Sequence, residues 1–150
     1  MLYFAYGSNM ATRTMRTLGD DWELVSRARL DDYRLAFTRP SQRWGGGAAD
    51  VISSPGQTVW GVLYRVGPIS LAALDEKEGL GVAYRRIDCQ VRSADGTIHV
   101  AMTYTVIDKA DPELCPAPRY TAVILEGAVE HALPQLYIQW LRTAGQPDGS

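Results

Sequence analysis

The chain has 150 residues, of which 46% are apolar and 21% are charged, and its net charge is −2. At this length, such an ordinary composition predicts one globular domain with a sizeable core. The 15 basic residues are spread along the chain and do not form the patch or stripe of a nucleic-acid-binding protein. No apolar stretch is long enough to span a membrane. We therefore expect neither a nucleic-acid nor a membrane partner.

Several other classes of protein are disfavoured by what the sequence lacks. The N-terminus has no secretion-signal pattern, and Cys89 and Cys115 are too few for a disulfide framework, so a cytoplasmic location is expected. His99 and His131 stand at no metal-ligand spacing, and Ser8 is not in the G-x-S-x-G motif of a serine hydrolase. We expect no metal centre. Any chemistry must depend on carboxylates, tyrosines and backbone amides.

The chain begins with an apolar run, Leu2 to Ala5, which predicts a strand, and Met10 to Thr17 is typical of a short helix. Between them stands Tyr6-Gly7-Ser8-Asn9. One interpretation is a corner in which the side chain of Ser8 or Asn9 caps the helix. The other is a nest of backbone N–H groups, next to a hydroxyl and an amide, which suits an anion or a developing oxyanion.

Strand-like runs dominate the first two thirds of the chain. They number six or seven, several of them apolar at consecutive positions, which favours a curved sheet or small barrel over an open flat sheet. The fold class predicted is α+β, a small mixed, mainly antiparallel β-barrel-like sheet flanked by α-helices. The runs after the first are Glu23 to Leu30 and Tyr33 to Arg39, split by Asp31-Asp32; Trp44 to Val51; Thr58 to Val66, after a turn at Ser54-Pro55-Gly56; Tyr84 to Arg92, in which Cys89 is a small core residue; and Ile98 to Ile107.

Three helices are predicted, each with a proline in its first turn, where the missing N–H needs no partner. They run from Pro68 to about Glu78, from Pro118 to about Ala132, and from Pro134 to about Gly145. The last six residues, GQPDGS, have the composition of a flexible tail, so the prediction is a single domain over 1–144 and a tail over 145–150. In the last helix the predicted packing stripe consists of Leu136, Tyr137, Trp140 and Leu141.

Glu78 occupies an unusual position in the segment SLAALDEKEGLGVAY. On a helix it shares the face of Leu71 and Leu74, whereas Glu76 and Lys77 fall away from that face. Glu78 therefore points toward the interior in the last helical turn. The helix macrodipole and burial both disfavour an ionised carboxylate there, and both raise its pKa toward the range useful for proton transfer. Glu78 is the candidate general acid/base.

Structural alternatives remain open for this segment. Glu78 pairs with an arginine such as Arg85 or Arg86, or the helix is shifted by one residue. Asp75 also lies near the apolar face and is the competing acid/base candidate. Otherwise Asp75 hydrogen-bonds backbone groups and braces the helix.

Several segments resemble, in order, those of the gamma-glutamylcyclotransferases. They are LYFAYGSNM at the start, GGGAADVISSPGQTVWGVLYRV in the middle, LDEKEG followed by GVAYRR, and PAPRYTAVILEGAVEHALP near the end. Each segment alone is weak, but the ordered set covers nearly the whole chain, to about Tyr137. Two departures touch the pocket rim: the link from Gly79 to Tyr84 is a residue shorter than in animal enzymes, and Trp44-Gly45 lacks the histidine that some members carry.

The resemblance implies a barrel-like α+β fold with one deep pocket, and release of 5-oxoproline from gamma-glutamyl amides without metal or organic cofactor. It implies that Glu78 is the catalytic acid/base and that the Tyr6-to-Asn9 turn holds the gamma-glutamyl group. Backbone N–H groups near Gly7, Ser8 and Asn9 would bind either the α-carboxylate or the γ-oxyanion. Tyr84 and Tyr120 match family tyrosines that border the pocket, although the pattern alone leaves Tyr120 in the pocket or in the core.

The expected partner is a small-molecule gamma-glutamyl substrate whose leaving amine stays open: an amino acid, a lysine-derived amine, glutathione or a specialised biosynthetic intermediate. Glutathione is disfavoured because the EKEG and PRYTAVILEGA segments look more like the general enzymes than the glutathione-specific branch. The rival class is a non-catalytic pocket protein that binds an acidic metabolite or a protein partner, for which Glu78 would be a costly residue. The sequence does not fix the oligomeric state, and a weak homodimer is compatible with it.

Overall fold

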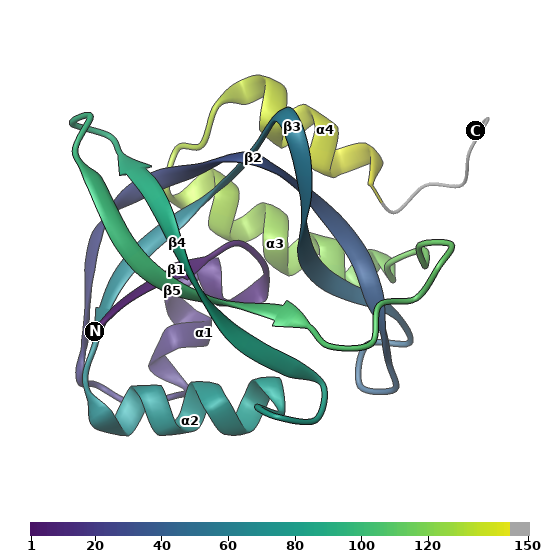
Figure 1. Cartoon of the computed structure of the whole chain (residues 1–150), viewed down its shortest axis with the longest axis horizontal. Helices are drawn as coiled ribbons and strands as arrows, with labels where there is room; N and C mark the ends of the chain where they lie inside the picture. The colour runs from purple at the N-terminus through teal and green to yellow at the C-terminus, as the bar shows by residue number, and fades with distance from the viewer. Residues whose placement is uncertain (145–150) are drawn as a thin grey trace.

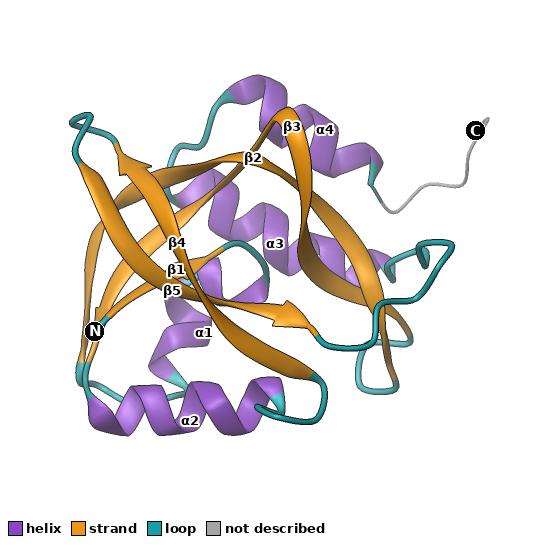
Figure 2. Ribbon diagram, in the orientation of Figure 1, coloured by secondary structure: helices purple, strands orange, loops and turns teal. Residues whose placement is uncertain are grey.

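Five strands close into a barrel in the computed structural model, which describes residues 1–144 (Figures 1 and 2). Around the barrel the order is β1-β3-β2-β4-β5. All pairings are antiparallel except the parallel contact of β1 with β5, so the predicted mixed, mainly antiparallel α+β barrel is confirmed. The strands are β1 Leu2–Ala5, β2 Trp22–Ser41, β3 Gly46–Val66, β4 Tyr84–Ser93 and β5 Ile98–Val106.

The helices lie outside the barrel, and Figure 2 shows them as separate segments around it. They are the 3-10 helix η1 Ser8–Met10 and the α-helices α1 Thr12–Arg16, α2 Pro68–Glu78, α3 Pro118–Glu130 and α4 Gln135–Thr143. Within residues 1–144, every helix falls short of the length and hydropathy that a membrane-spanning helix requires. The tail predicted over 145–150 lies outside the described residues, and the single domain over 1–144 stays a prediction.

The strands β2 and β3 form one long hairpin, and here the predicted number of strands is wrong. Asp31-Asp32 does not split β2; it forms a bulge at which Asp32 has a positive φ of 65° and the pairing register shifts. On the facing strand, Gly56 also has a positive φ, of 83°, and its N–H donates to the Asp32 carboxylate at 3.0 Å. The turn-forming residues therefore bend a continuous ribbon, as bulges do in closed barrels. Strand β3 begins at Gly46, because Trp44 belongs to the turn before it.

The barrel interior is filled by apolar side chains from all five strands. Cys89 is buried on β4, as predicted, and burial raises the pKa of its thiol to about 12. Gly61 on β3 lies where a Cβ atom would come within 2.3 Å of the Ala5 carbonyl oxygen, so the strands β1 and β3 need glycine there. This close approach holds the end of β1 against β3, so the turn that follows β1 begins directly beside the barrel.

Proline starts helices α2 and α3, as predicted. Helix α2 ends at Gly79, whose φ of 65° is the left-handed conformation typical of a glycine after a helix. Helix α4 begins one residue after Pro134, and its predicted packing stripe is only partly right: Leu141 is buried, but Leu136 is 81% exposed. Trp140 is exposed as well, and the face that packs against the protein passes through Tyr137, Ile138 and Leu141.

Candidate functional site

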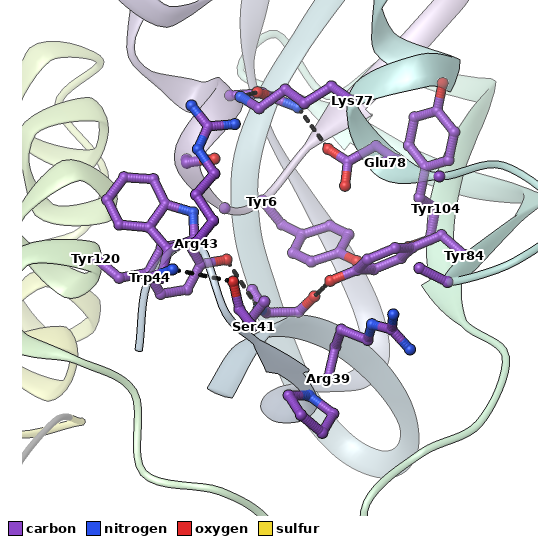
Figure 3. A pocket seen from close by; sticks show the side chains of 18 of the residues that line it. Tyr6, Arg39, Ser41, Arg43, Trp44, Lys77, Glu78, Tyr84, Tyr104 and Tyr120 are labelled. Carbon is purple, nitrogen blue, oxygen red and sulfur yellow. Dashed lines mark hydrogen bonds between the residues drawn. The ribbon is translucent and has the colours of Figure 1, made fainter. Parts of the chain in front are cut away.

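A cavity of about 640 Å³ opens beside the barrel where α2 ends and the turn after β1 begins (Figure 3). All seven predicted site residues line it. Four come from the turn after β1, one from the end of α2, one from the start of β4 and one from the first turn of α3. They are Tyr6, Gly7, Ser8, Asn9, Glu78, Tyr84 and Tyr120.

Glu78 stands in the last turn of α2 on the inner side of the helix, as the periodicity predicted, with Leu74 fully buried on the same side. Its Oε1 accepts a hydrogen bond from Asn9 Nδ2 at 2.9 Å. Removal from water raises the pKa of the Glu78 carboxyl, while the Lys77 ammonium, the Asn9 amide and the Arg43 guanidinium each lower it. The net direction is upward, so Glu78 holds a proton more readily than an exposed glutamate does.

The alternative pairing of Glu78 with Arg85 or Arg86 is wrong. Arg86 instead forms an ion pair with Asp75, whose Oδ1 also accepts a hydrogen bond from the Tyr104 hydroxyl at 2.6 Å. Asp75 thus braces α2 against β4 and β5 through side chains and not through backbone groups. Two carboxylates of α2 line the cavity: Glu76 is exposed to solvent, whereas Glu78 is partly buried.

Lys77 also lines the cavity, as does the exposed Glu76, which corrects the expectation that both residues fall away from the inner face. Its Nζ donates to Asn9 Oδ1 at 2.5 Å. Desolvation lowers the pKa of the Lys77 ammonium, and Arg43 lowers it further, whereas Glu78 raises it. Because the lysine stem is long and flexible, it folds back from the side of the helix toward the cavity, which the direction of the Cα–Cβ bond alone did not predict.

Asn9 does not cap a helix: neither η1 nor α1 has a side-chain cap. Its amide is instead buried, and it donates to the Tyr3 hydroxyl at 3.0 Å as well as to Glu78, while it accepts from Lys77. The capping interpretation of the turn is therefore wrong. Asn9 connects the turn after β1 to the end of α2 and fixes the position of the Glu78 carboxyl.

The three predicted tyrosines are buried around the cavity: Tyr6, Tyr84 and Tyr120. Tyr6 donates to the Tyr104 carbonyl at 2.6 Å. The backbone of Ala49 forms a hydrogen bond with each of the other two tyrosines. Its carbonyl accepts from the Tyr84 hydroxyl, and its N–H donates to the Tyr120 hydroxyl, each at 2.8 Å. Burial raises the pKa of all three phenols, so they stay protonated and act as fixed walls and hydrogen-bonding groups.

Gly7 lies close to Ala49 and Tyr120. A Cβ atom added to it would stand 3.4 Å from the Ala49 Cβ and 3.6 Å from the Tyr120 hydroxyl. Its carbonyl accepts from the Met10 N–H at 3.1 Å, which closes the helical turn η1. Ser8 begins that turn on the cavity side. A side chain at position 7 would extend toward Tyr120, so glycine keeps this part of the cavity open.

Further residues of the cavity were not predicted from the sequence. Tyr3 and Tyr104 stand on β1 and β5 with their rings in edge-to-face contact, and Arg39 and Arg43 come from the end of β2 and the turn after it. Trp44, which was expected at the pocket rim, lines the cavity beside Arg43. Strand β1 is apolar throughout and β5 is buried at consecutive positions from Ala101 to Val106, so no alternation singles out the two tyrosines. No sequence signal placed the arginines, because their position depends on how the long hairpin curls over the barrel end.

The histidines lie away from this chemistry. His131 ends α3 and contacts the Met10 carbonyl oxygen through Nε2 at 2.9 Å, and His99 contacts the Ser93 hydroxyl. Within residues 1–144, no group of three or more histidine, cysteine, aspartate or glutamate side chains has the arrangement of a metal site. The chemistry available in the cavity is therefore that of two carboxyl groups, Glu76 and Glu78, several hydrogen-bond donors and three cationic side chains.

The chain matches the AIG2-like family over residues 58–141. It is 37% identical to the gamma-glutamylcyclotransferase of Mus musculus over 147 residues, which cover 94% of this chain and 77% of the relative. The gamma-glutamylcyclotransferase of Homo sapiens is 34% identical over 146 residues, with coverage of 94% and 77%. A solved structure of a gamma-glutamyl cyclotransferase superposes with a TM-score of 0.91 at 33% identity, covering 99% of this chain and 89% of the other.

Proposed function

The chain belongs to the gamma-glutamylcyclotransferase family, and from this premise we propose that it releases 5-oxoproline from gamma-glutamyl amides with Glu78 as general acid/base. One observation carries the proposal: a carboxyl group with a raised pKa faces a cavity and is oriented by Asn9. A group of this kind is suited to move protons. The relatives' names do not favour the alternative of a non-catalytic binding protein.

The substrate supplies its own nucleophile in this reaction. Its α-amine attacks the γ-carbonyl carbon, a five-membered lactam closes, and the bond to the leaving amine breaks. Reactions between well-oriented groups of one molecule reach effective molarities of roughly 10⁵ M or more. The protein therefore contributes by holding the substrate in the bent, attacking conformation, and it needs no serine or cysteine nucleophile.

Two proton transfers need help from the protein. The α-ammonium, of pKa about 8, must lose a proton before it attacks, and the leaving nitrogen must gain one, since an amide anion is a poor leaving group. Glu78 performs both: its carboxylate takes the first proton and its acid form delivers it to the departing nitrogen. The second proton that the α-nitrogen loses on becoming a lactam is balanced by protonation of the released amine in water.

The turn from Tyr6 to Asn9 binds the gamma-glutamyl group in this proposal. The first N–H groups of a helical turn have no acceptor within the turn, so those at the start of η1 suit either the α-carboxylate or the γ-oxyanion. Tyr84 and Tyr120 line the cavity next to this turn, and their hydroxyls are held by Ala49. Gly7 allows the substrate to approach the backbone closely.

Several finer assignments accompany the proposal. We expect a cytoplasmic protein that acts on small gamma-glutamyl compounds of the kind linked to glutathione metabolism, without a nucleic-acid or membrane partner, and that forms at most a weak homodimer. Light scattering across a concentration series tests the last expectation: a mass that rises with concentration indicates the dimer, and a mass fixed at that of one chain rules it out over the range measured.

The activity is tested by mass-spectrometric detection of 5-oxoproline after incubation with gamma-glutamyl amino acids, gamma-glutamyl-lysine and glutathione. The Glu78→Gln variant is the matched control, because it keeps the size of the side chain and removes its acid/base function. Product with the wild type and none with a folded variant is the expected result. Equal product with both would contradict the role of Glu78, and no product from any compound would contradict the activity.

A further inference from the structure

The cavity presents more positive than negative charge to a substrate. Arg39, Arg43 and Lys77 line it, against the carboxylates of Glu76 and Glu78. A gamma-glutamyl amino acid carries two carboxylates, one on the glutamyl unit and one on the leaving amino acid, whereas a gamma-glutamyl amine carries one. With three cations in the cavity, one of them can bind the second carboxylate, that of the leaving amino acid.

Lys77 is already engaged, because its ammonium donates to the Asn9 side chain. Arg39 lies beside Tyr84, whose pKa its charge lowers, and Figure 3 shows it apart from Lys77 across the cavity. Arg43 stands on the Lys77 side, where its charge acts on both Lys77 and Glu78. Within residues 1–144 the Arg43 guanidinium makes no hydrogen bond or ion pair, so its donors are available to a ligand.

The turn that carries Arg43 is held in place from two sides. The Gly45 N–H donates to the Ser41 carbonyl at 2.8 Å, which closes the turn. From α3, the Arg119 guanidinium donates to the carbonyl oxygens of Arg43 and Trp44. Both guanidiniums also lie over the Trp44 ring, at 5.6 Å for Arg43 and 5.4 Å for Arg119. Arg43 is thus a positioned cation at the mouth of the cavity, although its side chain is exposed.

Arg43 also marks the direction in which the cavity continues. A second hollow of about 430 Å³ shares part of its wall with the first. The shared residues are Ser8, Arg43, Trp44, Glu76 and Lys77. A leaving group that extends from the γ-carbonyl past Ser8 has room on this side. In the second hollow Arg13 is paired with Glu126, so Arg43 is the cation free to meet an anion there.

We propose that Arg43 is a specificity-determining residue, whose guanidinium binds the carboxylate of the leaving amino acid and so favours gamma-glutamyl amino acids over gamma-glutamyl amines. The inference rests on the proposed function of the same cavity. Guanidinium and carboxylate groups pair in a planar, two-bond geometry that places the leaving nitrogen relative to Glu78. An uncharged leaving group of the same size receives no such placement.

The test compares gamma-glutamyl-L-alanine with gamma-glutamyl-L-alaninamide, which has nearly the same shape but no charge on its leaving group. The ratio of the two kcat/KM values is measured for wild type, Arg43→Gln, Arg43→Lys and Arg39→Gln. In the wild type the acid is favoured by about tenfold or more, the size of a charged hydrogen bond. Arg43→Gln reduces the ratio toward one by slowing only the acid, Arg43→Lys restores part of it, and Arg39→Gln leaves it unchanged.

Equal slowing of both substrates by Arg43→Gln, or a wild-type ratio near one, overturns the proposal while the activity itself stands. If neither substrate is turned over, the proposed function fails. The role of Arg43 is then judged from calorimetric dissociation constants of the two compounds with the Glu78→Gln protein, with and without Arg43→Gln. A preference for the acid that depends on Arg43 supports the site, and equal binding contradicts it.

Discussion

Two carboxylates close to the same cavity have opposite surroundings. Asp50 on β3 is fully buried and accepts hydrogen bonds on both oxygens, and Lys109 pairs with it. Glu78 is only partly buried, accepts one bond from Asn9 and faces the cavity. The donors to Asp50 are the hydroxyls of Thr38 and Thr105, the N–H groups of Val51 and Val106, and the Lys109 ammonium, at 2.6–3.0 Å.

The two surroundings give the two carboxylates different roles: that of Asp50 stabilises the fold, and that of Glu78 is available to a substrate. A carboxylate whose lone pairs are all used by the protein stabilises the fold and has little capacity left for a substrate. A partly buried carboxylate that accepts one hydrogen bond from the protein can still accept hydrogen bonds from a substrate. Its partial removal from water also raises its pKa, as at Glu78. We therefore expect substitutions of Asp50 to affect mainly folding and substitutions of Glu78 to affect mainly turnover.

The largest effect is expected for Glu78→Gln. Removal of the acid/base group should lower kcat by a factor of about 10² to 10⁴, the usual contribution of positioned proton transfer. Stability should not fall, since the amide keeps the shape and carries no charge into the cavity. 5-Oxoproline release and urea unfolding of the same preparation measure both quantities.

The pH dependence of that stability difference provides the control. The folded-state pKa of Glu78 is raised above its ordinary value of 4.5, so the folded state binds the proton more tightly than the unfolded state. Wild type therefore loses stability relative to Glu78→Gln as the pH rises from about 4.5 through the folded-state pKa. A difference that stays constant over this range would contradict the raised pKa.

The next effect is expected for Asp50→Ala, which leaves two buried hydroxyls and two N–H groups without their acceptor. The free energy of unfolding should fall by about 3 kcal/mol, measured by urea denaturation. For the protein that remains folded, kcat should change by less than about tenfold, well below the acid/base effect. Lys109→Met is the matched control and should cost less, because Asp50 keeps its other donors. A kcat loss as large as that of Glu78→Gln would show that Asp50 takes part in turnover and not mainly in folding.

A smaller effect is expected for Asn9→Ala, which removes the donor that orients Glu78. The Asn9 hydrogen bond lowers the pKa of Glu78, so its loss raises this pKa and moves the acidic limb of the kcat/KM profile to higher pH. We expect a loss of kcat of about tenfold, the size of a hydrogen bond to a charged group. Rate measurements from pH 4 to pH 8 follow both changes, and an acidic limb that moves to lower pH would disagree with this geometry.

The smallest effect is expected for Tyr120→Phe. It leaves the buried Ala49 N–H without an acceptor, next to Asp50 in the chain, and should lower the free energy of unfolding by about 1 kcal/mol. Because the phenol is held as a wall and not as an acid, kcat should change little. A loss of kcat comparable with that of Glu78→Gln would assign Tyr120 a chemical role.

Features set by local sequence were predictable. The prolines located the helix starts, the 3.6-residue period placed Glu78 on the inner face of α2, and the turn after β1 was identified from its residue types. Each of these depends on neighbours within one or two turns of the chain. The resemblance to a family connected Tyr84 and Tyr120 to the same pocket, which no local pattern could do.

Features set by barrel closure were not predictable. Asp31-Asp32 and Ser54-Pro55-Gly56 have the residues of turns, yet they form bulges because the long hairpin must bend around the barrel. Lys77 reaches the cavity because Asn9, remote in sequence, offers it an acceptor. Arg39 and Arg43 take part in the cavity only through the way the hairpin end folds over it. Contacts between distant segments decide all of these.

The most direct test of the contrast between the two carboxylates is a carbon-13 NMR titration of the glutamate side-chain carboxyls, with Glu78 assigned from the signal missing in Glu78→Gln. We expect Glu78 to titrate above its ordinary pKa of 4.5, because removal from water outweighs the nearby cations and the Asn9 amide. A carboxyl that titrates at or below 4.5 would show that the cations dominate, and would contradict the view of Glu78 as a carboxyl poised to move protons.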